Sequence, residues 1–271
     1  MKKIDPPILK AHLLKKIHHG FFTRQGGVSK DLYASLNCSW RSDKPEGSRD
    51  ADETVLENRK RAVEAVGADF KNLCLVKQVH GNHVEIIHTV PKKVVEGDAL
   101  VTKSNHLVLS IQTADCTPVL LWDSECGVIG AAHAGWRGAL VGVIQNTVKA
   151  METLGAKPRS ISAAIGPCIH QDSYEIGPEV YDAFIKKSED NSDFFTEQDV
   201  PKKLLFDLPG YVERQLEQSG VKEIERLPYC TYEQEDLFFS CRRATHRHEK
   251  GFGGHFSLIS LGDKKKLAKG S

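Results

Sequence analysis

The sequence contains no run of about 18 consecutive apolar residues, the length that a membrane-spanning helix needs. Its first stretch, MKKIDPPILKAHLLKKIHHGFF, carries lysines but too short an apolar segment for a secretory signal. An excess of charge of one sign is also lacking, because 37 Lys and Arg residues stand against 36 Asp and Glu, a net charge of +1. We therefore expect a cytoplasmic protein with no membrane or nucleic-acid partner, whose anionic ligands are held by local arginines.

The seven cysteines lack a CxxC pair and any regular spacing, which excludes a small disulfide framework and predicts reduced thiols. Internal repeats and low-complexity linkers are lacking too. The 40% hydrophobic and 27% charged composition is that of an ordinary folded chain. We expect a single domain over residues 1–271, with a flexible tail at about 262–271, GDKKKLAKGS.

Short apolar runs alternate with helical stretches along the middle of the chain. Runs rich in Val, Ile and Leu predict strands at 73–79, 106–113, 118–122 and 127–133. Apolar residues at helical spacing, each closing on a glycine, predict helices at 54–67, at 139–155 and around 209–219. This mixture predicts an α/β or α+β fold with largely buried sheets.

Three residues with metal-binding side chains follow or end predicted strands: His80, Cys116 and His133. Strand ends meet at one rim of a sheet, so these side chains could share a cavity. Two imidazoles and a thiolate suit Zn²⁺, and three protein ligands leave a fourth position for water or substrate. The small neighbours of His133 in GAAHAGWRGA (130–139) would let a ligand or the backbone approach closely. A buried structural cysteine and hydrogen-bonded histidines remain the alternative.

Arginines supply the second signal. Arg24 precedes the glycines of TRQGGVS, Arg59 lies on the first predicted helix, and Arg242 and Arg243 are adjacent in FFSCRR. Arginine binds phosphate through a planar fork of donors, so these four are candidates for holding phosphate or substrate. Ordinary surface or salt-bridged arginines are the alternative.

The order of several motifs resembles one family: TRQGGVS…SLN, KQVHG, GDALVT, TADCTPVLL, GAAHAGWRG and FFSCRR. The chain is similar to YfiH-like proteins, also called polyphenol oxidases or laccase-domain proteins and now regarded as purine nucleoside phosphorylases. The likeness runs from about Gly20 to Leu261. It implies an α-β-β-α sandwich and zinc held by His80, Cys116 and His133.

The resemblance also implies an activity. Members phosphorolyse adenosine, inosine and S-methyl-5'-thioadenosine and deaminate adenosine, so purine nucleosides and phosphate are the expected partners of a monomer or homodimer. Deamination would use metal-activated water and a carboxylic acid/base, for which Asp98 and Asp115 are candidates; Asp115 could equally orient a ligand or form a turn.

Two positions depart from the family pattern. Cys241 stands where FFSYRR has tyrosine, and His255 in GGHF stands where we expect arginine. His255 could replace that charge only when protonated, and Arg247 could compensate.

Three other readings stay open. One is a copper-dependent, laccase-like polyphenol oxidase, although the sequence has only one HxH segment, at 246–248, and no evident axial methionine. The second is a hydrolase with Cys116 and His133 as nucleophile and base, a chemistry compatible with peptidoglycan editing. The third is a non-enzymatic protein with a structural zinc, which a fourth ligand such as His83 would support.

Overall fold

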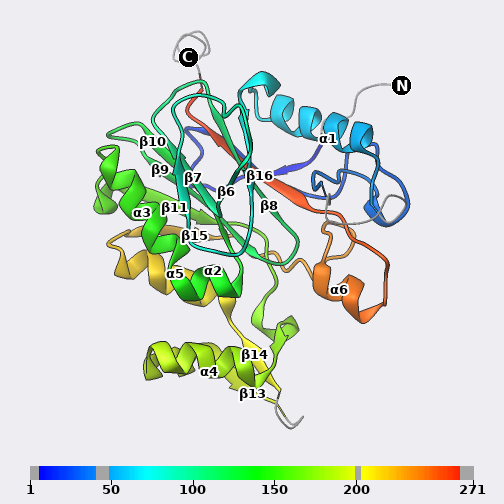
Figure 1. The fold of residues 1–271 in the computed structure, drawn as a ribbon, viewed down its shortest axis with the longest axis vertical. Helices are drawn as coiled ribbons and strands as arrows, with labels where there is room; N and C mark the ends of the chain where they lie inside the picture. The colour runs from blue at the N-terminus through cyan, green and yellow to red at the C-terminus, as the bar shows by residue number, and fades with distance from the viewer. Residues whose placement is uncertain (1–5, 41–48, 199–202, 263–271) are drawn as a thin grey trace.

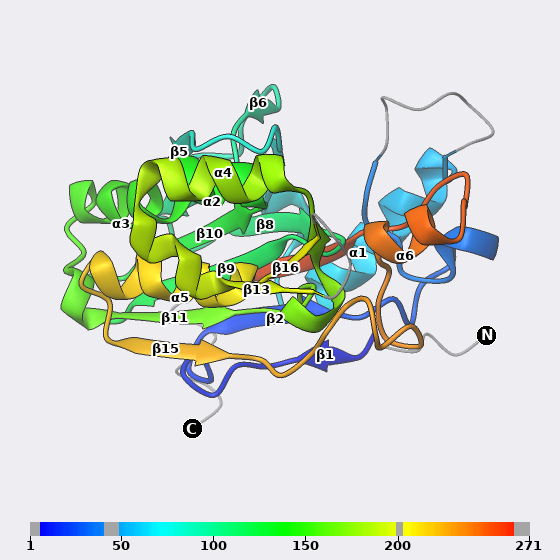
Figure 2. The same cartoon turned by 90° about the horizontal axis from the view of Figure 1, so that it is seen from below.

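The computed structural model describes residues 6–40, 49–198 and 203–262. Two packed β-sheets form its centre and helices cover both outer faces (Figures 1 and 2). The predicted class, mixed sheets layered between helices, is confirmed. Most of the predicted tail, from residue 263 onward, lies outside the described residues.

Most strands belong to the two large sheets. The five-stranded sheet has the order β1 (Ile8–Leu9), β2 (His18–Phe22), β16 (His255–Ser260), β8 (Val108–Thr113) and β3 (Leu73–Cys74). The six-stranded sheet has the order β15 (Glu223–Arg226), β11 (Ile161–Ile165), β9 (Thr117–Asp123), β10 (Val128–Ala134), β7 (Ala99–Thr102) and β5 (Val84–Ile86).

Two smaller sheets lie outside this sandwich. One consists of β12 (Glu175–Ile176), β14 (Leu204–Phe206) and β13 (Phe195–Glu197), and the other pairs β4 (Val76–Lys77) with β6 (Val95–Glu96). Together with the helix α4 (Pro178–Lys187), strands β13 and β14 extend from the lower end of the view in Figure 1.

The described residues also form six α-helices and five short 3₁₀ turns. The helices are α1 (Asp52–Ala65), α2 (Trp136–Val141), α3 (Val143–Thr153), α4 (Pro178–Lys187), α5 (Leu208–Gln218) and α6 (Cys241–His246). The 3₁₀ turns are Asp31–Tyr33, Phe70–Asn72, Pro158–Ser160, Gln171–Ser173 and Glu189–Phe194. No helix among the described residues is both long and apolar enough to span a membrane.

Alternation of side chains along the strands builds three apolar layers. On β10, Ile129 and Ala131 pack between the two large sheets, whereas Val128 and Ala132 face the helices α3 and α5. The outer face of the five-stranded sheet packs against α1. His133 is two residues after Ala131 and four after Ile129, so its side chain points to the same face of β10 as theirs. This is the face that meets the other sheet.

Three predicted strands and two predicted helices are confirmed within a few residues, as β8, β9, β10, α1 and α5. The predicted strand at 73–79 is wrong, because the chain leaves the five-stranded sheet after β3 and pairs β4 with β6 instead. The single helix predicted at 139–155 is also wrong. Gly142 adopts a left-handed conformation (φ 93°) that ends α2, and α3 begins at the next residue.

Candidate metal centre

Three separate segments bring His80, Cys116 and His133 together. His80 follows β4 by three residues, Cys116 lies in the turn between β8 and β9, and His133 is the penultimate residue of β10. Their ligand atoms all lie within 4.8 Å of one another, and Cys116 Sγ is 3.9 Å from His80 Nε2. The two imidazoles meet edge to face, at 4.8 Å between centroids. A soft thiolate with two imidazoles is a donor set that fits zinc.

The buried carboxylate of Asp98 orders this arrangement. Oδ1 accepts hydrogen bonds from His133 Nδ1 at 2.8 Å and from the His80 amide at 2.9 Å, and Oδ2 accepts one from the Gly81 amide at 2.7 Å. Because Nδ1 of His133 is engaged, Nε2 is the nitrogen that it could offer to a metal. Burial alone would raise the pKa of Asp98, but the hydrogen bonds from His133 and the amides outweigh it and hold that pKa below its usual range. Asp98 therefore acts as an ionised orienting group.

The backbone beside two of the candidate ligands is strained. His80 itself has a φ of 60°, and Asp115, next to Cys116, has a φ of 84°. Non-glycine residues rarely adopt this left-handed region, and strain of this kind is retained where the surroundings enforce it. At His80 the enforcing contacts are the amide hydrogen bonds to Asp98. At Asp115 they are hydrogen bonds from Thr231 Oγ1, Ser240 Oγ and the Arg242 amide.

The close packing of the centre explains why small residues surround His133. A Cβ atom on Gly135 would lie 2.8 Å from His80 Cδ2 and 3.1 Å from Cys116 Sγ. One on Gly138 would lie 2.7 Å from the Gly81 carbonyl oxygen. Glycine is therefore required where the candidate ligands pass over the end of β10 and the start of α2.

Gly135→Ala is expected to lower zinc affinity, because the added methyl group displaces His80 and Cys116 from their shared position. Gly130→Ala on the same strand is the matched control, since its Cβ would meet the flexible Met151 Sδ at 3.1 Å. The measurement is the zinc dissociation constant by chelator competition. Equal zinc affinity in the two variants would refute this explanation of Gly135.

The surroundings of Cys116 favour a metal ligand over an activated nucleophile. Burial, and next the charge of Asp115, raise the pKa of its thiol. Nucleophilic cysteines instead have positive surroundings that lower the pKa. A bound cation reverses this balance because it stabilises the thiolate directly. His83, the fourth ligand considered from the sequence, contacts Glu85 at 3.2 Å and is not part of the three-residue group.

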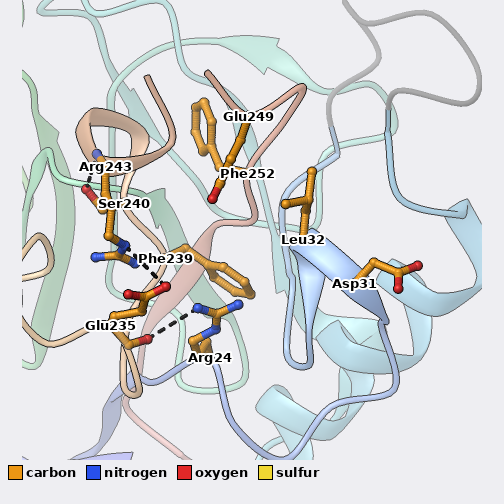
Figure 3. A pocket seen from close by; sticks show the side chains of 9 residues that line it. All are labelled: Arg24, Asp31, Leu32, Glu235, Phe239, Ser240, Arg243, Glu249 and Phe252. Carbon is orange, nitrogen blue, oxygen red and sulfur yellow. Dashed lines mark hydrogen bonds and ion pairs between the residues drawn. The ribbon is translucent and has the colours of Figure 1, made fainter. Parts of the chain in front are cut away.

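Arg24 and Arg243 line one pocket of about 210 Å³ (Figure 3). Most donors of Arg243 are committed to main-chain carbonyls of the preceding segment, at Thr231, Tyr232 and Phe238. Arg24 donates to the carbonyls of Ala34 and Glu235, and its guanidinium lies 4.5 Å from the centre of the Phe239 ring. Both arginines therefore hold loops together at this pocket.

The other two candidate arginines lie elsewhere. Arg242 donates from Nη1 to the Glu175 carbonyl, its guanidinium lies over the Tyr174 ring at 5.2 Å, and its amide binds Asp115 at 2.6 Å. Arg242 therefore contacts Asp115, the residue that directly precedes Cys116. Arg59, a residue of α1, is buried and lies between the rings of Trp40 and Phe256. The four arginines do not form one cluster.

His255 does not supply the charge of an arginine, contrary to the expectation that it could do so on protonation. Nε2 accepts a hydrogen bond from the Phe239 amide at 2.8 Å, and Nδ1 donates to the Thr113 carbonyl at 3.0 Å. Burial lowers the pKa of His255 to about 3, so the ring is neutral at physiological pH. Arg247 forms a two-pronged ion pair with Glu235 at the surface.

A reciprocal pair of glutamines was missed by the sequence analysis. Gln78 Nε2 donates to the Gln112 carbonyl at 2.7 Å, and the Gln112 amide donates to Gln78 Oε1 at 2.8 Å. The pair joins the segments that carry His80 and Cys116. Gln78 stands inside the KQVHG motif, but a glutamine in sequence gives no sign of its partner.

The fold and the three-residue centre together define an α/β protein with a candidate metal site at the ends of its strands. Residues 18–262 match the family model described as multi-copper polyphenol oxidoreductase laccase, and the chain belongs to this family of YfiH-like proteins. It is 40% identical over 237 residues to a purine nucleoside phosphorylase of Deinococcus radiodurans, covering 88% of this chain and 87% of the relative. It is 36% identical over 234 residues to a purine nucleoside phosphorylase of Corynebacterium glutamicum, covering 85% and 91%.

Solved structures agree with this assignment of the fold. YlmD from Geobacillus stearothermophilus superposes with a TM-score of 0.86 at 26% identity, covering 97% of this chain and 98% of its own. The Bacillus licheniformis hypothetical protein YfiH superposes with a TM-score of 0.85 at 25% identity, covering 94% and 97%.

Proposed function

We propose that this protein is a zinc-dependent purine nucleoside phosphorylase that acts on adenosine, inosine and S-methyl-5'-thioadenosine, with adenosine deamination as a second activity. The observation that carries the proposal is the His80–Cys116–His133 group, with its ligand atoms within 4.8 Å and Asp98 orienting one imidazole. The names of the relatives, purine nucleoside phosphorylases at 32–40% identity, support the reaction type.

Two imidazoles and a thiolate are also the trigonal ligands of a blue-copper site, and zinc is the proposed metal because the described residues show neither further metal-binding groups nor an axial methionine beside them. Among the described residues the three-residue group is the sole cluster of this kind, whereas multi-copper chemistry needs several neighbouring sites. A blue-copper centre would add a weak axial methionine. The one methionine of the described residues, Met151, packs in the apolar core against Gly130. Bound at His80, Cys116 and His133, zinc would supply a Lewis acid that polarises an oxygen or nitrogen of the substrate.

Arg242 is the residue that we propose for holding phosphate. Phosphorolysis needs a phosphate oxygen to attack the anomeric carbon as the purine leaves, while positive charge develops on the sugar. Arg242 lies beside Asp115 and Tyr174 at the Cys116 side of the centre, and a guanidinium there would bind the attacking anion and orient it. Arg24 and Arg243 would instead shape the neighbouring loop, because each already uses two side-chain nitrogens to bind carbonyl oxygens, whereas Arg242 uses Nη1 alone in its hydrogen bond to the described residues.

Deamination is proposed as the slower activity. Zinc deaminases use a carboxylic group as proton donor and acceptor. The two carboxylates considered for this role, Asp98 and Asp115, each accept three or more hydrogen bonds from protein groups. They are therefore better suited to holding the ligand-bearing segments than to transferring protons.

The test is to incubate metal-analysed protein with adenosine, with and without inorganic phosphate, and to separate adenine, inosine and hypoxanthine. We expect adenine and ribose 1-phosphate only when phosphate is present, and slower formation of inosine in both reactions. Adenine formation at the same rate without phosphate, or none with it, would contradict the proposal. Protein treated with a zinc chelator should lose both activities, whereas a metal-free cysteine hydrolase would keep its activity and be sensitive only to alkylation.

A further inference from the structure

Trp40 is an exposed aromatic residue in an unusual setting. Its side chain is 41% exposed, and it is the one aromatic among the large apolar residues found at the surface of the described chain. The guanidinium carbon of Arg59 lies 3.9 Å from the centre of its ring. The guanidinium covers one face of the indole, so a stacking partner would have to use the opposite face.

Arg59, under this ring, is a cation with no carboxylate partner among the described residues. The residue is 2% exposed, and its side chain donates to the Cys38 carbonyl at 2.8 Å and to Gln112 Oε1 at 3.2 Å. No carboxylate of the described residues pairs with it, and its buried Nη1 has no hydrogen-bond partner there. Although burial lowers the pKa of Arg59 to about 10, the group stays charged at neutral pH. Its charge therefore acts chiefly on the aromatic rings that sandwich it.

A short series of contacts connects this residue pair with the metal centre. Gln112, which accepts from Arg59, also forms the reciprocal pair with Gln78, two residues before His80. Gln112 itself lies on β8, whose following turn carries Cys116. Trp40 and Arg59 are thus linked to the segment of His80 through Gln112 and Gln78, and Arg242 is linked to the segment of Cys116 through Asp115.

We propose that Trp40 is the platform on which the purine base of the substrate stacks, with Arg59 as its fixed cationic backing. This assignment rests on the proposed function. A cation against one face withdraws electron density from the indole, which strengthens stacking of an electron-rich purine on the other face. Base stacking on an aromatic side chain changes affinity by roughly 5- to 150-fold when the ring is removed.

The test measures binding of the free base adenine to the zinc-loaded protein by calorimetry and by tryptophan fluorescence. We expect W40F to bind adenine within about threefold of the parent, because phenylalanine keeps a stacking face. We expect W40L, which keeps an apolar cover over Arg59, to bind about tenfold or more weakly. Adenine should quench the emission of the parent and of the control W122F, but not that of W40F. Phosphate affinity and zinc content should be unchanged in all variants.

Two results would overturn the assignment. One is W40L binding adenine as tightly as W40F does, with normal zinc content and a normal unfolding temperature. The other is equal quenching of the parent and W40F, which would place the base near another tryptophan. The proposed function fails separately, in the phosphate-dependence assay of the unmutated protein, whether or not Trp40 binds the base.

Discussion

Cys116→Ala is expected to abolish zinc binding and to lower phosphorolysis by at least about a hundredfold, because a Lewis-acid metal contributes several kcal/mol to the transition state. The chain should stay folded, since Cys116 lies in a turn and belongs to none of the three apolar clusters. Zinc content by elemental analysis, kcat/KM for adenosine and the unfolding curve together check this expectation.

Cys126→Ala is the matched control for this variant. Cys126 is another partly exposed thiol, located in the turn that follows β9 at the opposite end of that strand. It should keep its zinc and its activity. A zinc-free Cys116→Ala protein that still phosphorolyses adenosine at the parental rate would show that the centre does not serve this reaction.

His133→Ala should have the same effect on zinc with an added loss of stability. Asp98 is fully buried, and removing the imidazole takes away the hydrogen bond that His133 Nδ1 donates to its carboxylate. Cys116→Ala is for this reason the cleaner test of the metal.

Asp98→Asn is expected to weaken zinc binding about 10- to 100-fold and to lower the free energy of unfolding by about 3 kcal/mol or more. The amide keeps the shape of the carboxylate but turns an NH₂ group toward donors at His80, Gly81 or His133. His133 then loses the acceptor that fixes its tautomer. Chelator competition and denaturant unfolding measure the two effects.

Asp123→Asn is the control that separates the loss of zinc affinity from the loss of stability expected for Asp98→Asn. Asp123 is an equally buried carboxylate that accepts hydrogen bonds from the amides of Glu125 and Lys157 and from Ser160 Oγ, at the end of β9 remote from Cys116. Its replacement should lower stability without changing zinc affinity. If Asp98→Asn kept parental zinc affinity, Asp98 would have no role in orienting the candidate ligands.

The layered fold was predictable where side chains follow a clear period. The runs that became β8, β9 and β10 are largely apolar because both faces of these strands are covered, and α1 and α5 show helical spacing closed by glycine. The error at 73–79 arose because an apolar run does not show where a strand leaves one sheet for another. The error at 139–155 arose because Gly142 fits a helical pattern as well as a left-handed break.

The three candidate metal ligands could be picked out from the sequence because each stands at or near a strand end with a small or turn-forming neighbour. Their orienting groups were less so. Asp98 could be suspected as a proton donor from its motif, but its hydrogen bonds to His80 and His133 depend on the meeting of β7 and β10. Likewise, the sequence gives no sign that His255 is neutral and buried or that Arg243 binds main-chain carbonyls, since both depend on contacts formed only in the folded chain.

X-ray absorption at the zinc edge of protein purified without added metal tests the central claim most directly. We predict one sulfur at about 2.3 Å and two imidazole nitrogens at about 2.0–2.1 Å, with one further light atom from water or substrate, and a shift of that atom's signal on adding phosphate or adenosine. A second sulfur, a third imidazole or the absence of zinc would contradict the assignment of an open three-ligand centre at His80, Cys116 and His133.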